Sequence, residues 1–164
     1  MSVQIREEKR AWGLAALALL VALTFSKIEG PIFRALFLDV ETVTISEQSG
    51  NVAPKVSAYR KIKKDYTGGF SVEVRDATTG TYVCKSPYPW RLNYKAAANQ
   101  INPLEMSLRQ WFGTAADYDA CLKDSRYASG EFFTITCHWT HVFGWLRLER
   151  CVDSNVYERH VNDL

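Results

Sequence analysis

The chain has 164 residues, a length typical of one domain or of one domain with an appendage. It carries 20 Lys and Arg residues against 18 Asp and Glu residues, and this net charge of +2 gives no basic footprint for nucleic acid. Hydrophobic residues make up 47% of the chain and charged residues 23%, with 9 Gly and 5 Pro, which excludes disordered and collagen-like classes.

An uncharged stretch, AWGLAALALLVALTFS, runs from Ala11 to Ser26. As a helix these residues span roughly 24 Å, a little less than a ~30 Å hydrocarbon core. Lys27 can snorkel and Ile28 adds length. A cleaved signal peptide, a buried core helix and an uncleaved signal anchor are the competing interpretations. The stretch lacks a good cleavage site and is apolar on all sides, so we favour a transmembrane signal anchor over residues 11–28.

Basic residues flank this stretch unequally. Arg6, Lys9 and Arg10 precede it, whereas Lys27 and Arg34 follow, which places the N-terminus inside. The expected organisation is a cytoplasmic N-terminus (1–10), the anchor (11–28), a juxtamembrane segment (29–40) that begins near the break at Gly30-Pro31, and an exported domain (41–164). We therefore expect a single-pass protein of a bacterial inner membrane with its C-terminal domain in the periplasm. The lipid bilayer would be the partner of residues 11–28.

Four cysteines, Cys84, Cys121, Cys137 and Cys151, all lie beyond the apolar stretch. An even count in an exported domain predicts two disulfides. Cys137 and Cys151 are equidistant from Gly144, so a symmetric hairpin would place them opposite each other, although strand alternation assigns them to different faces. We prefer Cys137–Cys151 with Cys84–Cys121, and Cys84–Cys137 is the main alternative.

Most of the remaining chain has the pattern of short β-strands. Candidate strands lie at Glu41–Ile45, Val56–Tyr66, Phe70–Asp76, Thr81–Cys84, Glu131–Val142 and Leu146–Glu158. The segment Glu131–Val142 alternates: one face holds Phe133, Ile135, Cys137 and Trp139, and the other holds Thr134, Thr136, His138 and Thr140. Such alternation is typical of a half-buried strand.

One helix is predicted within this β-rich part. Asn102-Pro103 has the signature of a helix start, and Gly113 supplies the stop about ten residues later. Leu104, Leu108 and Trp111 would share one face of this helix.

The segments FSVEVRDATTGTYVC, GEFFTITCHW and SNVYERH together resemble an immunoglobulin-like or fibronectin-like sandwich. A short N-terminal span before such a domain is similar to small single-pass proteins encoded in phage and prophage genomes of proteobacteria. The expected fold is mainly β: an N-terminal transmembrane helix followed by an antiparallel immunoglobulin-like β-sandwich with one short helix. The resemblance implies a phage-encoded accessory role near lysis or envelope modification.

Two clusters invite metal hypotheses. His138 and His141 with Cys137 and Cys151 offer zinc ligands, but two histidines three apart on a strand point to opposite faces. The acidic residues Asp117, Asp119 and Asp124 do not match the spacing of a calcium-binding loop. We expect no metal and no cofactor. Neither a Gly-x-Ser-x-Gly elbow nor a P-loop motif occurs, so we do not expect an enzyme.

Aromatic residues suggest a binding surface instead. Tyr88, Trp90 and Tyr94 flank Arg91 in an irregular segment, a composition found in protein-binding hot spots and also suited to stacking on sugars. Alternatively, Trp90 fills the end of the core. The favoured function is a non-enzymatic, membrane-anchored envelope protein whose sandwich binds a protein or envelope component. The alternatives are a small accessory subunit of an inner-membrane complex and a membrane-tethered cell-wall enzyme.

Overall fold

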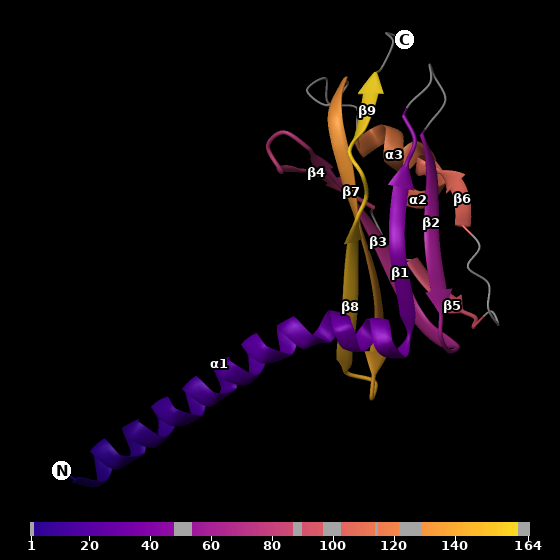
Figure 1. Cartoon of the computed structure of the whole chain (residues 1–164). Helices are drawn as coiled ribbons and strands as arrows, with labels where there is room; N and C mark the ends of the chain where they lie inside the picture. The colour runs from indigo at the N-terminus through magenta and orange to yellow at the C-terminus, as the bar shows by residue number, and fades with distance from the viewer. Residues whose placement is uncertain are drawn as a thin grey trace.

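The computed structural model describes residues 2–47, 54–86, 90–96, 103–113, 115–121 and 129–160. Figure 1 shows a long N-terminal helix followed by a β-rich body. Its elements in chain order are α1 (Ser2–Leu36), β1 (Leu38–Ile45), β2 (Lys55–Ile62), β3 (Tyr66–Asp76), β4 (Tyr82–Lys85), β5 (Trp90–Tyr94), β6 (Pro103–Ser107), α2 (Leu108–Phe112), α3 (Ala115–Cys121), β7 (Ser129–Val142), β8 (Leu146–Asp153) and β9 (Tyr157–His160).

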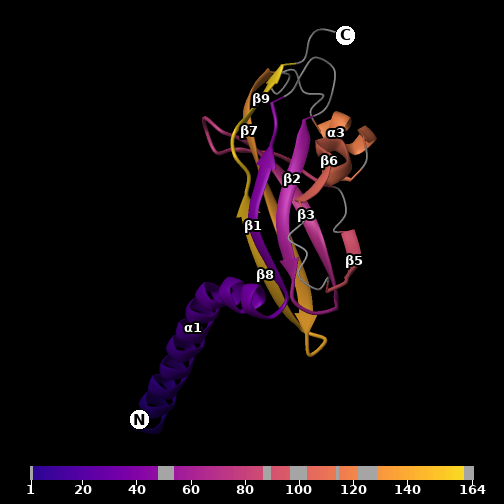
Figure 2. The same cartoon turned by 45° about the vertical axis from the view of Figure 1, so that its right-hand side comes forward.

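Two antiparallel sheets form the body, in a sandwich-like arrangement (Figures 1 and 2). The smaller sheet has the order β1-β2-β6. The larger sheet has the order β4-β3-β7-β8, with β5 also paired to β3 and β9 also paired to β7. Side chains from both sheets meet in one hydrophobic core, including Val43 and Val56 from the smaller sheet and Val72 and Val74 from the larger. The expectation of a mainly β protein is therefore correct.

Helix α1 does not end at Gly30-Pro31, as the sequence predicts, but continues to Leu36. Its N-terminal part extends away from the body, whereas its last turns lie against the sandwich (Figure 1). There Phe33 is fully buried, and the Glu29 Oε1 atom accepts a hydrogen bond of 2.7 Å from the backbone N–H of Glu149 in β8. The predicted juxtamembrane segment is thus largely helical and packed on the domain.

The predicted transmembrane anchor at residues 11–28 is wrong. In the part of the chain that the structure describes, no helix is long and apolar enough to cross a membrane. The physical reason is the short uncharged run, which lies between Arg10 and Lys27 and spans roughly 24 Å against a ~30 Å hydrocarbon core. The transmembrane part of the expected fold class is corrected accordingly.

The face of strand β7 that packs against the core is not the face that carries most of its apolar side chains. Its buried side chains include Thr134, Thr136, His138 and Thr140, whereas Phe133, Ile135 and Cys137 are only partly buried on the outer face. Polar partners make this orientation possible: Trp111 Nε1 donates to Thr136 Oγ1 at 3.0 Å, and Thr140 Oγ1 donates to the backbone carbonyl of Thr67 at 2.7 Å. Cys137 therefore shares the outer face with its partner on β8.

The predicted helix after Asn102 begins later than expected. Residues 103–107 form strand β6, which pairs with β2, and helix α2 begins after Ser107. Ser107 and Gln110 make a capping box, which satisfies backbone N–H groups at the helix start. Gly113 ends the helix with a φ of 140°, as the sequence predicts. A further helix, α3, contains two of the acidic residues considered above for calcium, Asp117 and Asp119.

Candidate functional site

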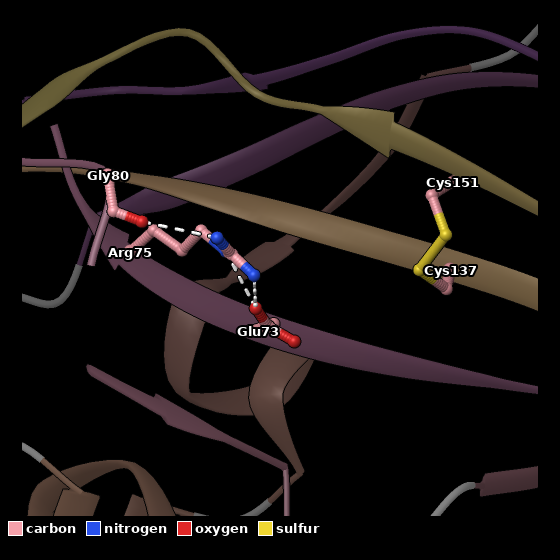
Figure 3. A network of polar contacts seen from close by, with 5 residues as sticks. All are labelled: Glu73, Arg75, Gly80, Cys137 and Cys151. Atoms are coloured by element: carbon pink, nitrogen blue, oxygen red, sulfur yellow. Dashed lines mark hydrogen bonds and ion pairs between the residues drawn. A yellow bond between two sulfur atoms is a disulfide. The ribbon is translucent and has the colours of Figure 1, made fainter. Parts of the chain in front are cut away.

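Two disulfides join the four cysteines in the pairs preferred from the sequence. Cys84–Cys121 links β4 to α3, and Cys137–Cys151 links β7 to β8. In the β7–β8 register Cys137 lies directly opposite Cys151. Figure 3 shows this bridge on the larger sheet, together with Arg75, which contacts Glu73 and the carbonyl oxygen of Gly80. The outer face of the sheet is thus covalently and ionically braced.

The cysteine–histidine zinc hypothesis fails on geometry. His138 is buried and His141 is exposed, because they lie on opposite faces of β7. The ligand-type atoms of Cys137, Glu149 and Cys151 lie within 4.8 Å of one another, but both sulfurs are already bonded in a disulfide. A disulfide sulfur is not the thiolate that zinc requires. This cluster therefore offers one carboxylate and no thiolate.

The four residues proposed for partner binding do not form one surface cluster. Tyr88 lies outside the described residues, and Trp90 is the first residue of β5. Tyr94 is buried and stacks on Tyr66, with ring centres 4.4 Å apart. Among the side chains of this group that the structure describes, only that of Arg91 is exposed to solvent. Arg91 and Tyr94 lie on opposite faces of β5 because side chains alternate along a strand. Residues 85–94 look irregular in the sequence and do not reveal this alternation.

Arg91 instead lines a depression on the outer face of the larger sheet. The depression has a volume of about 260 Å³, is open to solvent, and is lined by Thr67, Gly68, Arg91, Trp139 and His141. The strand register explains why these residues meet. Gly69 of β3 pairs with Arg91 of β5 on one side and with Trp139 of β7 on the other. Because Gly69 has no side chain, this row leaves space between Arg91 and Trp139.

Trp139 forms the wall of this depression and is only 7% exposed. The guanidinium group of Arg147 lies 5.0 Å from the centre of its ring, and the ring of His141 meets it edge-on at 5.4 Å. Position 68 requires glycine, since a Cβ there would collide with the Trp139 carbonyl oxygen. Trp139 Nε1 is buried and has no hydrogen-bond acceptor among the described residues. A buried indole N–H without a partner is uncommon and costly.

The turn between β7 and β8 adds an exposed apolar feature, which we call the hairpin tip (Phe143, Gly144 and Trp145). Phe143 is 82% exposed and Trp145 is 75% exposed. Phe143 has a φ of 54° and Gly144 a φ of 78°. Two positive φ values are typical of a tight hairpin turn, where Asn-Gly is the usual pair. Phe143 is therefore held in a conformation that disfavours bulky residues.

From the sequence alone, Gly144 marks only the turn of the expected hairpin between Cys137 and Cys151. The signal that could have identified the hairpin tip is an aromatic residue on each side of a turn glycine between two strong strands. Side chains at such a turn project away from the sheet, so a large aromatic there has little core to join. Trp111 does not lie at such a turn, and its side chain is buried against the core, unlike those of Phe143 and Trp145.

No protein-family description matches this chain, and no curated protein is similar to it in sequence. The resemblance to phage-encoded proteins with an immunoglobulin-like domain therefore stays a prediction.

Proposed function

We propose that this protein is a non-enzymatic binding protein that docks onto another protein through the end of its β7–β8 hairpin. The observation that carries the proposal is the hairpin tip, where Phe143 and Trp145 expose most of their surface. Soluble domains seldom place two neighbouring large aromatic residues so far into solvent without a partner.

The composition of this surface supports a protein partner. Tryptophan and arginine are enriched in binding hot spots, and Arg147, on β8, lies two residues after Trp145. A large aromatic side chain can bury about 150–250 Å² at an interface. The hairpin is a rigid support, because β7 and β8 pair in register from Ile135 to Val142 and are joined by the disulfide. Little conformational entropy would be lost when such a tip binds.

Two disulfides favour an oxidising compartment for this domain, since reduced cytosol does not maintain them. We therefore propose that the domain acts after export and that its partner is an envelope protein. The proposed accessory role requires no catalytic group, because the hairpin tip supplies the contact area.

The test is a site-specific crosslink followed by a measured affinity. A photo-crosslinking phenylalanine analogue at position 145 of the full chain should join the partner, whereas the same analogue at Tyr82 should not. Tyr82 is a matched control because it is an exposed aromatic residue on the same sheet, on β4, away from the hairpin tip (Figure 1).

The captured partner would then be purified and titrated calorimetrically. We expect Trp145→Ala to weaken binding at least about tenfold and Tyr82→Ala to change it less than about twofold. Equal affinity of the wild type and Trp145→Ala would contradict the proposal.

A further inference from the structure

We infer that the depression beside Trp139 binds the carboxylate of an acidic side chain on the protein partner. This inference rests on the proposed function and identifies the second, polar half of the same binding surface. Its basis is that Arg91 and Trp139 line one small solvent-open space. Among the described residues Arg91 has no ion pair, and the buried Nε1 of Trp139 has no acceptor.

Arg91 is the cationic side chain of the lining. Four other described arginines are each paired with a carboxylate: Arg34 with Asp39, Arg75 with Glu73, Arg109 with Asp119 and Arg147 with Glu149. Arg91 makes no ion pair with any described residue, although it projects from a strand paired along its length with β3. An arginine guanidinium binds a carboxylate through parallel N–H bonds, which gives direction as well as attraction.

Trp139 supplies the second donor. Its side chain is more than nine-tenths buried, and Nε1 lacks an acceptor among the described residues. The indole N–H only donates, so its missing partner must be an acceptor such as a carboxylate oxygen. A carboxylate carried by the partner would supply that acceptor.

Charge around the depression favours an acidic ligand. Glu149, which lies opposite Trp139 in the β7–β8 register, is paired with Arg147 at 2.8 Å. No described carboxylate forms an ion pair with Arg91, and His141 adds a further ring nitrogen to the lining. A like-charged ligand would meet repulsion here, whereas an acidic one would be attracted.

Size and position indicate a side chain from a docked protein. At about 260 Å³ the depression is smaller than the sites of ~300–1,000 Å³ that enclose drug-sized ligands. His141 precedes Phe143 by two residues, roughly 7 Å along an extended strand. A partner that covers the hairpin tip would therefore place neighbouring residues directly over the depression.

The test uses small probes and the full chain. The indole ¹H–¹⁵N signal of Trp139, assigned with Trp139→Phe, would be followed by NMR during titration with N-acetyl-aspartate amide. N-acetyl-asparagine amide is the neutral control of the same shape. We expect a saturable shift with a dissociation constant on the order of millimolar for the acid and no saturable shift for the amide.

Variants and a sugar probe complete the design. Arg91→Gln should abolish the saturable shift, whereas Arg75→Gln, on the same sheet but paired with Glu73, should retain it. Absence of a saturable shift with the acid, or its persistence in Arg91→Gln, would overturn the inference. Tighter binding of glucuronate than of N-acetyl-aspartate amide by about tenfold or more would also overturn it, in favour of an acidic sugar.

The two proposals fail separately. The affinity of Trp145→Ala for the captured partner reports on the hairpin tip, and the Trp139 signal reports on the depression without any partner present. If the hairpin tip binds the partner and the probes do not shift Trp139, the proposed function stands and only the carboxylate site is rejected.

Discussion

The hydroxyl group of Tyr94 lies 3.1 Å from Nδ1 of His138, inside the sandwich. Desolvation by burial raises the pKa of Tyr94 to about 12, so its hydroxyl stays protonated and can donate to the ring nitrogen. Burial also lowers the pKa of His138 to about 3, with a smaller contribution from Arg60. The pair is therefore a neutral hydrogen bond, and it allows a histidine to occupy the core face of β7.

Acid should destabilise this protein well above the range in which its carboxylates titrate. The pKa of His138 is about 3 in the folded state and about 6.5 when unfolded, so only the unfolded chain takes up this proton as the pH falls below about 6.5. We expect the free energy of unfolding to fall by about 2 kcal/mol between pH 7.5 and pH 5. Chemical denaturation at several pH values measures it.

His138→Gln removes the titrating group and retains an acceptor for Tyr94, so its stability should change little over the same pH range. The exposed His141→Gln variant should behave like the wild type. A wild-type stability that is flat from pH 7.5 to pH 5 would show that His138 is not held neutral.

Trp111 and Thr136 form the second buried polar contact of the core. Thr136→Val leaves Trp111 Nε1 buried without an acceptor, so we expect a loss of about 1–3 kcal/mol in the free energy of unfolding. Thr134→Val is the matched control on the same strand. The Thr134 hydroxyl is equally buried but has no hydrogen-bond partner among the described residues, so this change should be neutral or stabilising. Equal losses in both variants would contradict this account, and urea denaturation distinguishes them.

Six strands, β1, β2, β3, β4, β7 and β8, lie close to positions predicted from the sequence, because a period of two survives in a half-buried strand. Strand β5 lay in a segment that looked irregular, and β6 in a segment predicted as a helix. The orientation of β7 was not predictable from the sequence. Its apolar residues, Phe133, Ile135 and Trp139, outnumber those of the other face, yet Thr136 and His138 face the core. Their partners Trp111 and Tyr94 are distant in sequence, and local pattern contains no information about them.

The depression could not be predicted from the sequence for a similar reason. Arg91 was identified as a candidate binding residue, but it was grouped with its sequence neighbours. The structure places it across Gly69 from Trp139, and that pairing depends on the register of three strands. Register is determined by the assembled core and by turns, not by residues within about ten positions of Arg91.

Both disulfides should be present in the native protein. The intact mass should rise by about four hydrogens on reduction, and a proteolytic digest should contain a Cys84 peptide linked to a Cys121 peptide. A Cys84–Cys137 peptide would contradict the pairing. Replacing both members of the Cys137–Cys151 pair with Ser should lower the free energy of unfolding by about 3 kcal/mol, as expected for a loop of this length.

Asn155 links the two sheets through hydrogen bonds at one edge. Its Oδ1 accepts from the backbone N–H of Ile45 at 2.6 Å, and its Nδ2 donates to the Ile45 carbonyl at 2.9 Å. Asn155→Ala should cost about 1–3 kcal/mol and speed hydrogen exchange at the Ile45 amide. Asn155→Asp keeps the acceptor and loses the donor, so an intermediate loss is expected. Unchanged hydrogen exchange at Ile45 in the Ala variant would show that Asn155 does not link the two sheets.

Phe143 offers a test of whether strain at the hairpin tip serves binding. A non-glycine residue at a φ of 54° is disfavoured by roughly 1–2 kcal/mol, and Asn tolerates that conformation better. Phe143→Asn should therefore stabilise the fold by about 0.5–1 kcal/mol, measured by urea denaturation. It should also weaken binding of the crosslinked partner by about tenfold or more, since the exposed ring is lost.

A gain in stability with unchanged affinity would show that Phe143 is a tolerated defect of the turn. A loss of stability would show that the ring supports the fold despite its exposure. Only the combination of a more stable domain and a weaker complex fits a residue retained for contact with a partner, because binding sites are where proteins keep conformations that cost them stability.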